Sequence, residues 1–407
     1  MCLELIGKDG VKKEHYFKIT GYNGVPRIDI DVEEPIVSKE SYVDAKIKIY
    51  NCTDFGIVDT ICKVRGRGHT SWTFSDKKSY KIKLQKKCGA LLGITEDKEY
   101  CLLAEIWDKS LLRWGYMFEV AKALRMPFVP MYKHVELFIN NEYEGVYMLT
   151  EQIERSDNKV MIDRDGFMVE RDSYYYTEPL YFITNVIKEP MSFKYPDASD
   201  GDVREGDDNY NFITAYFDKV ESTLKAIESG SKDYQLYIDL NSFAKWYIAE
   251  ELLGNIDPNK YFVLRNRASK LEMGPVWDAD WSMGNASMIN GYWEKPPYQP
   301  TIDEVVCNVA YLQYLLKDKD FCDTVRREWG YLKPFINAIL QKMEEEAKKI
   351  EYAQIDNFVR WPILNTYLGC GLIALGSWEA EVAYVNDYFV ERAKWFDQYV
   401  LTLGLAN

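Results

Sequence analysis

Hydrophobic and polar residues alternate along much of the first 64 residues of the chain. The alternation is clearest in four segments, HYFKI (15–19), RIDIDV (27–32), DAKIKIY (44–50) and VDTICKV (58–64). A period of two residues is typical of strands that bury one face. The pattern therefore predicts an antiparallel β region at the start of the fold.

Further along the chain the pattern changes to helical spacing, with one more hairpin between. Apolar residues recur at helical spacing in 111–124, and residues 211–230, 240–254 and most of the chain from 305 onward are also predicted to be helical. Residues 134–150 are predicted to form a hairpin, because Asn140 and Asn141 tolerate the left-handed conformation of its turn. Residues 195–209 form an acidic, glycine-bearing loop. The order of elements indicates an α+β fold without repeats or linkers, which we interpret as one bilobed domain.

The stretch from Asn255 to Asn285 combines this strand pattern with three aspartates. Asp257 precedes Pro258, which favours an extended or turn conformation at the aspartate. A strand, a polar turn and a return strand are predicted to follow, at 261–264, 266–270 and 271–277. Asp278 and Asp280 come next, and they point to the same face if the return strand continues through them.

Two carboxylates on one face repel each other unless a cation or a shared proton holds them together. Oxygen-rich sites suit Mg²⁺ or Mn²⁺. A loop aspartate followed, one hairpin later, by a metal-binding aspartate is also the arrangement of phosphoryl-transfer sites. The alternative is that Asp278 and Asp280 are ordinary solvated residues at the end of a loop. Two aspartates at this spacing are more often solvated than bound to a metal.

A second candidate segment lies earlier, where Arg65–Trp72 (RGRGHTSW) leads into Lys77–Leu84 (KKSYKIKL). Glycines let backbone amides approach a phosphate closely, and a lysine on the adjoining strand can neutralise it. Alternation places Lys81 and Lys83 on one face. A plain turn followed by the wet face of a sheet explains the same residues. Arg113 or Glu119, on the predicted helix at 111–124, could contact the strand lysine or a phosphate.

Composition and charge exclude several classes of protein. The 407 residues carry 50 Lys and Arg against 64 Asp and Glu, a net charge of −14, which argues against nonspecific nucleic-acid binding and permits a basic protein partner. The eight cysteines contain no C-x-x-C pair, so we expect neither a zinc ribbon nor a redox motif, and scattered thiols fit a cytosolic protein. Neither a signal peptide nor a run of eighteen apolar residues is visible, so we expect a cytoplasmic protein without a membrane span.

Motifs spread along the chain resemble those of the spore coat protein H (CotH) kinase family, atypical protein kinases with a reduced kinase-like fold. The resemblance covers residues 25–402. Its motifs, in order, are RGHTSW…KKSYKIKL, WDKSLLRWGYMFEVAKAL, INNEYEGVYMLTEQIE, GFMVERD, FKYPD, NIDPNKYFVLRN, VWDADWSMGN, RWPI and YVNDYFVERAKWFD. Asn141 stands where the family usually has glycine.

The resemblance implies roles for particular residues. Asp257 is expected to act as the catalytic base or to orient the acceptor hydroxyl, and Asp280, with Asp278 beside it, to hold the magnesium. Asn259 would be a second metal ligand, although it follows Asp257 by only two residues, closer than in the general kinase pattern. The residues expected at the nucleotide are Lys81, Lys83, Lys78, Arg67, Gly68 and the hinge pair Glu151 and Gln152.

The resemblance also implies an architecture and an activity. A β-rich amino-terminal lobe (25–153) would follow an extension (1–24), and a mostly helical lobe (154–407) would carry the aspartates. The activity would be ATP-dependent transfer of the γ-phosphoryl group to Ser or Thr hydroxyls of a protein, basic or Ser-rich and of spore-coat type, with Mg²⁺ or Mn²⁺ and without haem or zinc. The alternatives are a pseudokinase or coat-assembly scaffold that binds partners without turnover, and a glycosidase with two opposed carboxyls.

Overall fold

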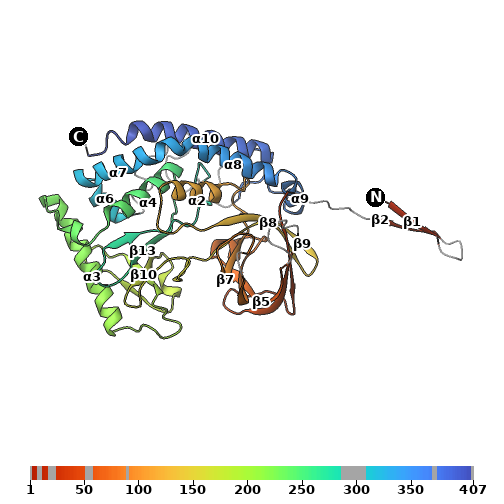
Figure 1. Ribbon diagram of the computed structural model, residues 1–407, viewed down its shortest axis with the longest axis horizontal. Coiled ribbons are helices and arrows are strands. Elements are labelled where there is room, and N and C mark those ends of the chain that lie inside the picture. Colours follow the sequence, from red (N-terminus) through yellow and green to blue (C-terminus); the bar gives the residue numbers. More distant parts are fainter. Residues whose placement is uncertain are drawn as a thin grey trace.

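A seven-stranded closed barrel forms one side of the molecule in a computed structural model of the chain (Figure 1). The structure describes residues 2–6, 12–16, 24–50, 58–88, 91–285, 309–368 and 374–404. The barrel strands, in their order around the barrel, are β3 (Arg27–Val32), β4 (Val43–Tyr50), β5 (Val58–Arg67), β6 (Ser79–Cys88), β7 (Asp97–Leu103), β9 (Glu142–Glu151) and β8 (Tyr132–Ile139). The pairing of β3 with β8 is parallel and closes the barrel, whereas all other neighbours are antiparallel.

The alternation in the sequence explains the inside of the barrel. Ile28, Ile47, Val64, Ile82 and Tyr100 come from five successive strands and are completely or almost completely buried in one apolar cluster. The polar residues between them face outward. A one-turn helix, α1 (Thr70–Phe74), joins β5 to β6, and a separate hairpin pairs β1 (Cys2–Ile6) with β2 (Lys12–Tyr16).

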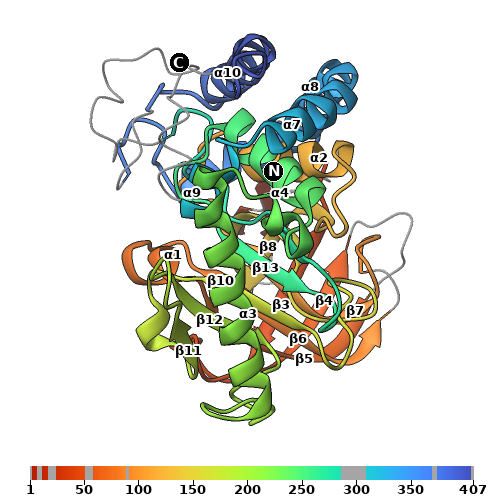
Figure 2. The same cartoon turned by 90° about the vertical axis from the view of Figure 1, so that its left-hand side faces the viewer.

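A second sheet of five strands lies beside the barrel. Its order is β11 (Tyr181–Ile183), β12 (Pro190–Tyr195), β10 (Phe167–Arg171), β13 (Lys260–Leu264) and β14 (Leu271–Met273), and all its pairs are antiparallel. Helix α3 (Asp208–Lys225) crosses one face of this sheet (Figure 2). Phe217 of α3 contacts Phe182 and Phe262 edge-on, so aromatic rings join the helix to the sheet.

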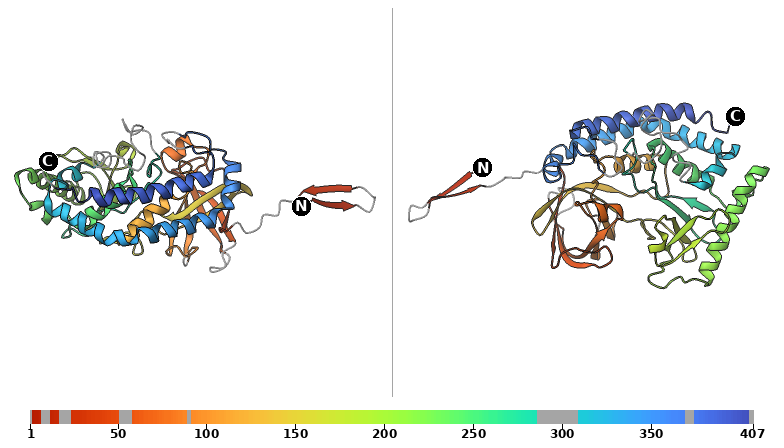
Figure 3. Two further views of the ribbon diagram at one scale, coloured as in Figure 1. Left: turned by 90° about the horizontal axis from the view of Figure 1, so that it is seen from above. Right: turned by 180° about the vertical axis from the view of Figure 1, so that it is seen from behind.

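Helices cover both sheets as a layer, in which α8 and α10 run side by side (Figure 3). The helices are α2 (Arg113–Ala123), α4 (Leu240–Leu253), α6 (Ala310–Leu315), α7 (Lys319–Leu332), α8 (Ile336–Ile350), α9 (Ala353–Arg360) and α10 (Trp378–Tyr399). Short 3-10 turns lie at Tyr175–Thr177, Ala226–Ser229, Asp233–Leu236 and Lys333–Phe335. Within the described residues, no helix is long and apolar enough to cross a membrane.

The α+β class and most of the predicted elements are confirmed. The strands predicted at 27–32, 44–50 and 58–64, the helices at 111–124, 211–230 and 240–254, and the helical carboxy-terminal part are present, and Asn140 and Asn141 have positive φ in the hairpin turn. Of the strand predicted at 15–19, residues 15–16 belong to β2 and residues 17–19 lie outside the described residues. Cys62, Cys101 and Cys322 are buried free thiols. The side chains of Cys2, Cys52, Cys88, Cys307 and Cys370, and the predicted helical start at 305–308, lie outside the described residues.

The predicted return strand at 271–277 is wrong in its second half. Strand β14 ends at Met273, because Gly274 has a φ of 116° and Pro275 has no N–H to donate to the ladder. Asp278 has a φ of 72°, so the chain does not continue as a strand through the two aspartates. Alternation along a strand is therefore not the reason why Asp278 and Asp280 lie near each other.

Candidate functional site

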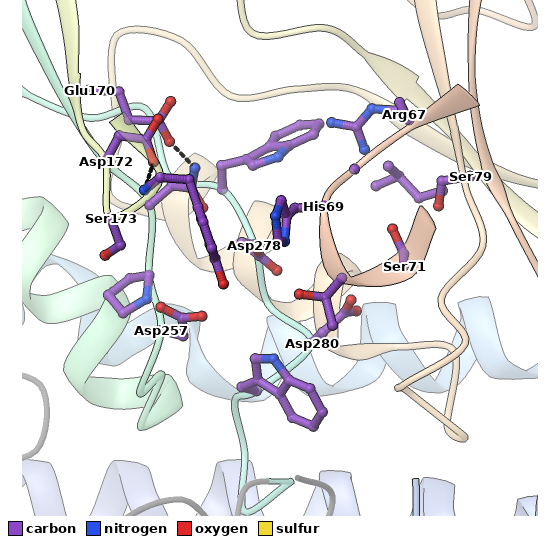
Figure 4. A pocket seen from close by; sticks show the side chains of 18 of the residues that line it. Arg67, His69, Ser71, Ser79, Glu170, Asp172, Ser173, Asp257, Asp278 and Asp280 are labelled. Carbon is purple, nitrogen blue, oxygen red and sulfur yellow. Dashed lines mark hydrogen bonds between the residues drawn. The ribbon is translucent and has the colours of Figure 1, made fainter. Parts of the chain in front are cut away.

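A pocket of about 430 Å³ lies between the barrel and the five-stranded sheet. We call it the aspartate pocket, because Asp257, Asp278 and Asp280 all line it (Figure 4). Its barrel side is formed by the turn from β5 into α1, and its other side by the end of β10 and the loop that follows. The pocket thus collects residues from many separate parts of the chain, from Lys39 to Trp281.

Asp257 is placed by the end of helix α4. Gly254 closes this helix in the left-handed conformation, with a φ of 55°, and the chain turns directly into Asn255. The Asn255 side chain accepts from the Asp257 N–H (3.2 Å) and donates to the Asp278 carbonyl (2.7 Å) and to the Glu250 carboxyl (2.8 Å). One asparagine therefore fixes the Asp257 loop to the Asp278 segment, while the Asp257 side chain stays exposed.

The environments of Asp278 and Asp280 favour the protonated acids. Burial, followed by the charge of Asp257, raises the pKa of Asp278 to about 7. Burial and the charge of Asp278 raise the pKa of Asp280 well above its usual value, against the hydrogen bond from the Trp114 indole (2.7 Å). Among the described residues, no lysine or arginine forms an ion pair with any of the three aspartates. A bound cation would supply this missing charge.

The start of helix α2 holds the Asp280 segment from behind. Asp108 and Arg113 form a fully buried ion pair at 2.5 Å, and the Asp108 carboxylate also accepts from the N–H groups of Leu112 and Arg113. The Arg113 guanidinium donates to the carbonyls of Ser282 (3.0 Å) and Met283 (3.4 Å). Arg113 is thus occupied by these groups, and the described structure gives it no place at a phosphate.

The predicted glycine turn forms part of the pocket wall. Arg67 and Gly68 both line the pocket, and Gly68 has a φ of 87°, which favours glycine. The Arg67 guanidinium lies 5.4 Å from the centre of the Trp277 ring. The next residue, His69, stacks on Tyr174 from the loop after β10, with ring centres 3.9 Å apart. This stack connects the barrel side of the pocket to the sheet side.

Asn259 also lines the pocket, but its side chain is engaged with the sheet. Its amide donates to Glu170 of β10, and Lys194 pairs with the other oxygen of Glu170 (3.1 Å) and with Glu178 (3.2 Å). Burial raises the pKa of Glu170, against the charge of Lys194. As a metal ligand, Asn259 would have to use its amide oxygen while the nitrogen remains with Glu170.

The predicted strand lysines lie on the outer face of the barrel, next to the pocket but outside its lining. Ser79, Lys81 and Lys83 share one face of β6, and only Ser79 lines the pocket. Both lysines pair with Glu99. Burial alone would raise the pKa of Glu99, but Lys81 and then Lys83 lower it to about 2. Lys78 donates instead to the Trp72 carbonyl at 2.5 Å.

The predicted hinge residues lie at the end of β9, beside this row of lysines. Glu151 accepts from the Met131 N–H (2.7 Å), and the Cys101 thiol donates to the Gln152 side chain (3.0 Å). Cys101 is directly opposite Lys81 in the β6–β7 ladder. Glu119, which could have met a phosphate, lies 3.9 Å from Lys122 on its own helix and does not line the pocket.

Comparison with known proteins assigns the chain to a family. A family model described as CotH kinase protein matches residues 64–396, which is most of the chain and includes every residue of the aspartate pocket except Lys39. The chain belongs to the CotH kinase family. No curated protein matches the chain.

Some residues in or beside the aspartate pocket of this CotH kinase chain were not singled out from its sequence. Asn255 and Trp114 lay inside quoted motifs, but their contacts with Asp257, Asp278 and Asp280 join distant segments. Glu105 is buried in the pocket wall, and its carboxylate lies 3.4 Å from His134. Lys260 follows Asp257 by three residues and lines the pocket as well. In the described part of the chain, no three His, Cys, Asp or Glu side chains surround one metal position.

Proposed function

We propose that the chain transfers the γ-phosphoryl group of ATP to Ser or Thr hydroxyls of a protein, with the aspartate pocket as its active site. One observation carries the proposal. The exposed Asp257 and the buried acids Asp278 and Asp280, which have no ion-pair partner among the described residues, converge on one pocket of about 430 Å³. Phosphoryl transfer needs a group that orients the hydroxyl and a carboxylate that holds metal on the phosphates. The family membership supports the same chemistry.

The residues present fit a magnesium or manganese ion brought with the nucleotide. Asp278 and Asp280 would hold it, because one or two carboxylates together with phosphate oxygens satisfy Mg²⁺. When bound, the ion would neutralise charge on the phosphates and on both carboxylates. Asp257 would orient the acceptor hydroxyl and accept its proton. Arg67 and the backbone around Gly68 would face the phosphates from the barrel side.

The remaining nucleotide contacts and the bilobed organisation belong to the same proposal. The row Ser79, Lys81, Cys101 and Gln152 leads from the pocket along the outer barrel face to the end of β9. A nucleotide with its phosphates at the aspartates would extend along this row toward Glu151 and Gln152. The barrel would then be the amino-terminal lobe (25–153), and the sheet and helices the carboxy-terminal lobe (154–407).

The test is transfer of labelled γ-phosphate with Mg²⁺ or Mn²⁺, to the protein itself and to basic, Ser-rich acceptor peptides, with ATP hydrolysis followed in parallel. We expect Asp257→Asn to lower the rate by about 10²–10⁴-fold while ATP still binds, because a base acts mainly in the transition state. Asp387→Asn, an exposed position on α10, is the matched control. ATP binding without transfer or hydrolysis by the wild type would support a pseudokinase scaffold instead.

A further inference from the structure

Two aromatic side chains meet in the aspartate pocket, one from each wall. His69 comes from the turn between β5 and α1, and Tyr174 comes from the loop after β10. Their rings are stacked, with centres 3.9 Å apart and planes 23° from parallel. Figure 4 shows the His69 side chain pointing from the barrel side of the pocket toward the sheet side. The stack is thus a direct contact between the two walls.

This stack lies at the open side of the pocket and not in its floor. His69 is exposed and Tyr174 is 43% exposed. Trp114 and Trp277, which also line the pocket, are only 4% and 5% exposed. A stacked pair that joins two walls at the open side covers part of the entrance, so a ligand that passes these rings has to separate them.

The backbones of both residues are held, which leaves the side chains as the parts that can move. The Tyr174 N–H donates to the Asp172 carboxylate (2.7 Å), and the Tyr174 carbonyl accepts from the Thr177 N–H and hydroxyl, both at 2.9 Å. The His69 carbonyl accepts from the Thr73 N–H at 3.0 Å. Rotation of either side chain would separate the rings and keep these hydrogen bonds, and exposed side chains change rotamer within nanoseconds.

We propose that His69 and Tyr174 form a latch that controls the entry and release of the nucleotide at the aspartate pocket. The identity of this ligand rests on the proposed function, whereas the latch rests on the stack itself. The two rings contact each other directly, so the latch closes with or without a ligand and slows entry and release by the same factor. An aromatic pair favours the closed state by about 3- to 10-fold. Because product release limits turnover in many enzymes, the latch would also limit the overall rate.

Stopped-flow fluorescence of a methylanthraniloyl derivative of ADP, with Mg²⁺, measures both rate constants. We expect His69→Ala and Tyr174→Ala each to raise the association and dissociation rate constants about 3- to 10-fold and to leave Kd within about twofold of the wild type. The double variant should be no faster than either single variant, because each ring acts through the other. His69→Phe and Tyr174→Phe keep a stacked pair and should behave as the wild type. Phe74→Ala, at a 72% exposed position on α1, is the matched control.

The outcomes separate a latch from direct binding and from a structural role. If the two single effects add in the double variant, or if Kd rises in proportion to the dissociation rate constant, the rings bind the nucleotide and the latch proposal is wrong. Unchanged rate constants in both alanine variants would overturn the latch alone, since the proposed phosphoryl transfer does not depend on it. A fall of several degrees in the Tm of either alanine variant would show a structural role instead. If the ADP derivative does not bind to the wild type, the proposed function fails, and the latch fails with it.

Discussion

Glu250 lies directly beneath the Asp257 loop and has an unusual state for a carboxyl group. It is completely buried in α4, and its side chain accepts a hydrogen bond from the Asn255 amide at 2.8 Å. Burial raises the pKa of Glu250 from 4.5 to about 8, against the Asn255 hydrogen bond and the charge of Lys260. At neutral pH the folded protein thus keeps Glu250 as an uncharged acid, hydrogen-bonded to Asn255, which connects Asp257 to Asp278.

This shift predicts a pH dependence of stability. Because the folded-state pKa is raised, Glu250 contributes fully below pH 4.5, and its contribution is lost as the pH rises to about 8. The Glu250→Gln variant keeps the hydrogen bond and cannot ionise. We therefore expect its free energy of unfolding to fall less than that of the wild type as the pH rises across this range. The difference should be on the order of 2–4 kcal/mol. Urea unfolding of both proteins at pH 5 and pH 8.5 checks this. An equal change in the free energy of unfolding between the two pH values for both proteins would contradict it.

At the scale of elements, helix α2 positions the segment that carries Asp280 through its first residue. Arg113 is only 1% exposed, and its partners are the Asp108 carboxylate and the carbonyls of Ser282 and Met283. Trp114, the next residue, donates to Asp280. The amino-terminal end of α2 therefore stabilises the fold and holds Asp280 at the same time.

We expect Arg113→Met to destabilise the protein by about 3–5 kcal/mol, because it leaves the Asp108 carboxylate buried without its partner. Lys122→Met, on the exposed side of the same helix, should change stability by about 0.5 kcal/mol or less. Chemical denaturation of both variants gives the comparison. An Arg113→Met protein as stable as the wild type would show that the ion pair does not hold this end of α2.

Elements with a strong local pattern could be predicted from the sequence, and contacts between distant elements could not. The barrel strands at 27–32, 44–50 and 58–64 and helix α2 were predicted from hydrophobic periodicity, whereas the barrel strand β7 was not predicted. Strand β14 is shorter than predicted, because Gly274 and Pro275 outweigh the apolar residues after them. Asp278 and Asp280 were identified from their spacing, but the positive φ at Asp278 means that alternation along a strand does not place them. The hydrogen bond from Trp114 to Asp280 joins residues 166 positions apart, and no local pattern reports it.

At the scale of the whole molecule, Asn357 of α9 links the helical layer to the barrel. Its side-chain oxygen accepts from the buried Lys77 ammonium (3.0 Å) and from the Val146 N–H (3.0 Å). Gly145 makes this approach possible, since a Cβ at that position would lie 2.6 Å from the Asn357 oxygen. The carboxy-terminal half of the chain thereby fixes a barrel strand at its edge.

Asn357→Ala should therefore destabilise the whole fold. It leaves the Val146 N–H and one donor of Lys77 unpaired in a buried position, at a cost of about 1–3 kcal/mol for each such group. Val359→Ala on the exposed side of α9 is the control, because Val359 is 76% exposed. Denaturant midpoints measure both effects. Equal midpoints for the two variants would mean that α9 and the barrel are joined mainly by other contacts.

The aspartate pocket depends on both parts of the molecule, because its walls come from the barrel and from the second sheet. Among the described residues, no lysine or arginine forms an ion pair with Asp278 or Asp280, although Arg67 lines the same pocket, and a triphosphate would add more negative charge. Metal-free nucleotide binding would thus meet repulsion from either group when it is ionised, whereas Mg²⁺ would favour the ionised forms of both and turn them into ligands. Asp280→Asn should therefore weaken nucleotide binding with metal and leave it unchanged or slightly improved without metal.

Calorimetry of ATP binding, with Mg²⁺ and with a chelator, tests this account most directly. We expect the chelator to weaken ATP binding to the wild type by about 1.4 kcal/mol or more, a factor of about ten. Asp280→Asn should lose affinity with Mg²⁺ and bind as well as the wild type or slightly better in chelator. If ATP binds to the wild type equally well in both conditions, Asp278 and Asp280 do not hold a metal, and the proposed phosphoryl transfer at this pocket is contradicted.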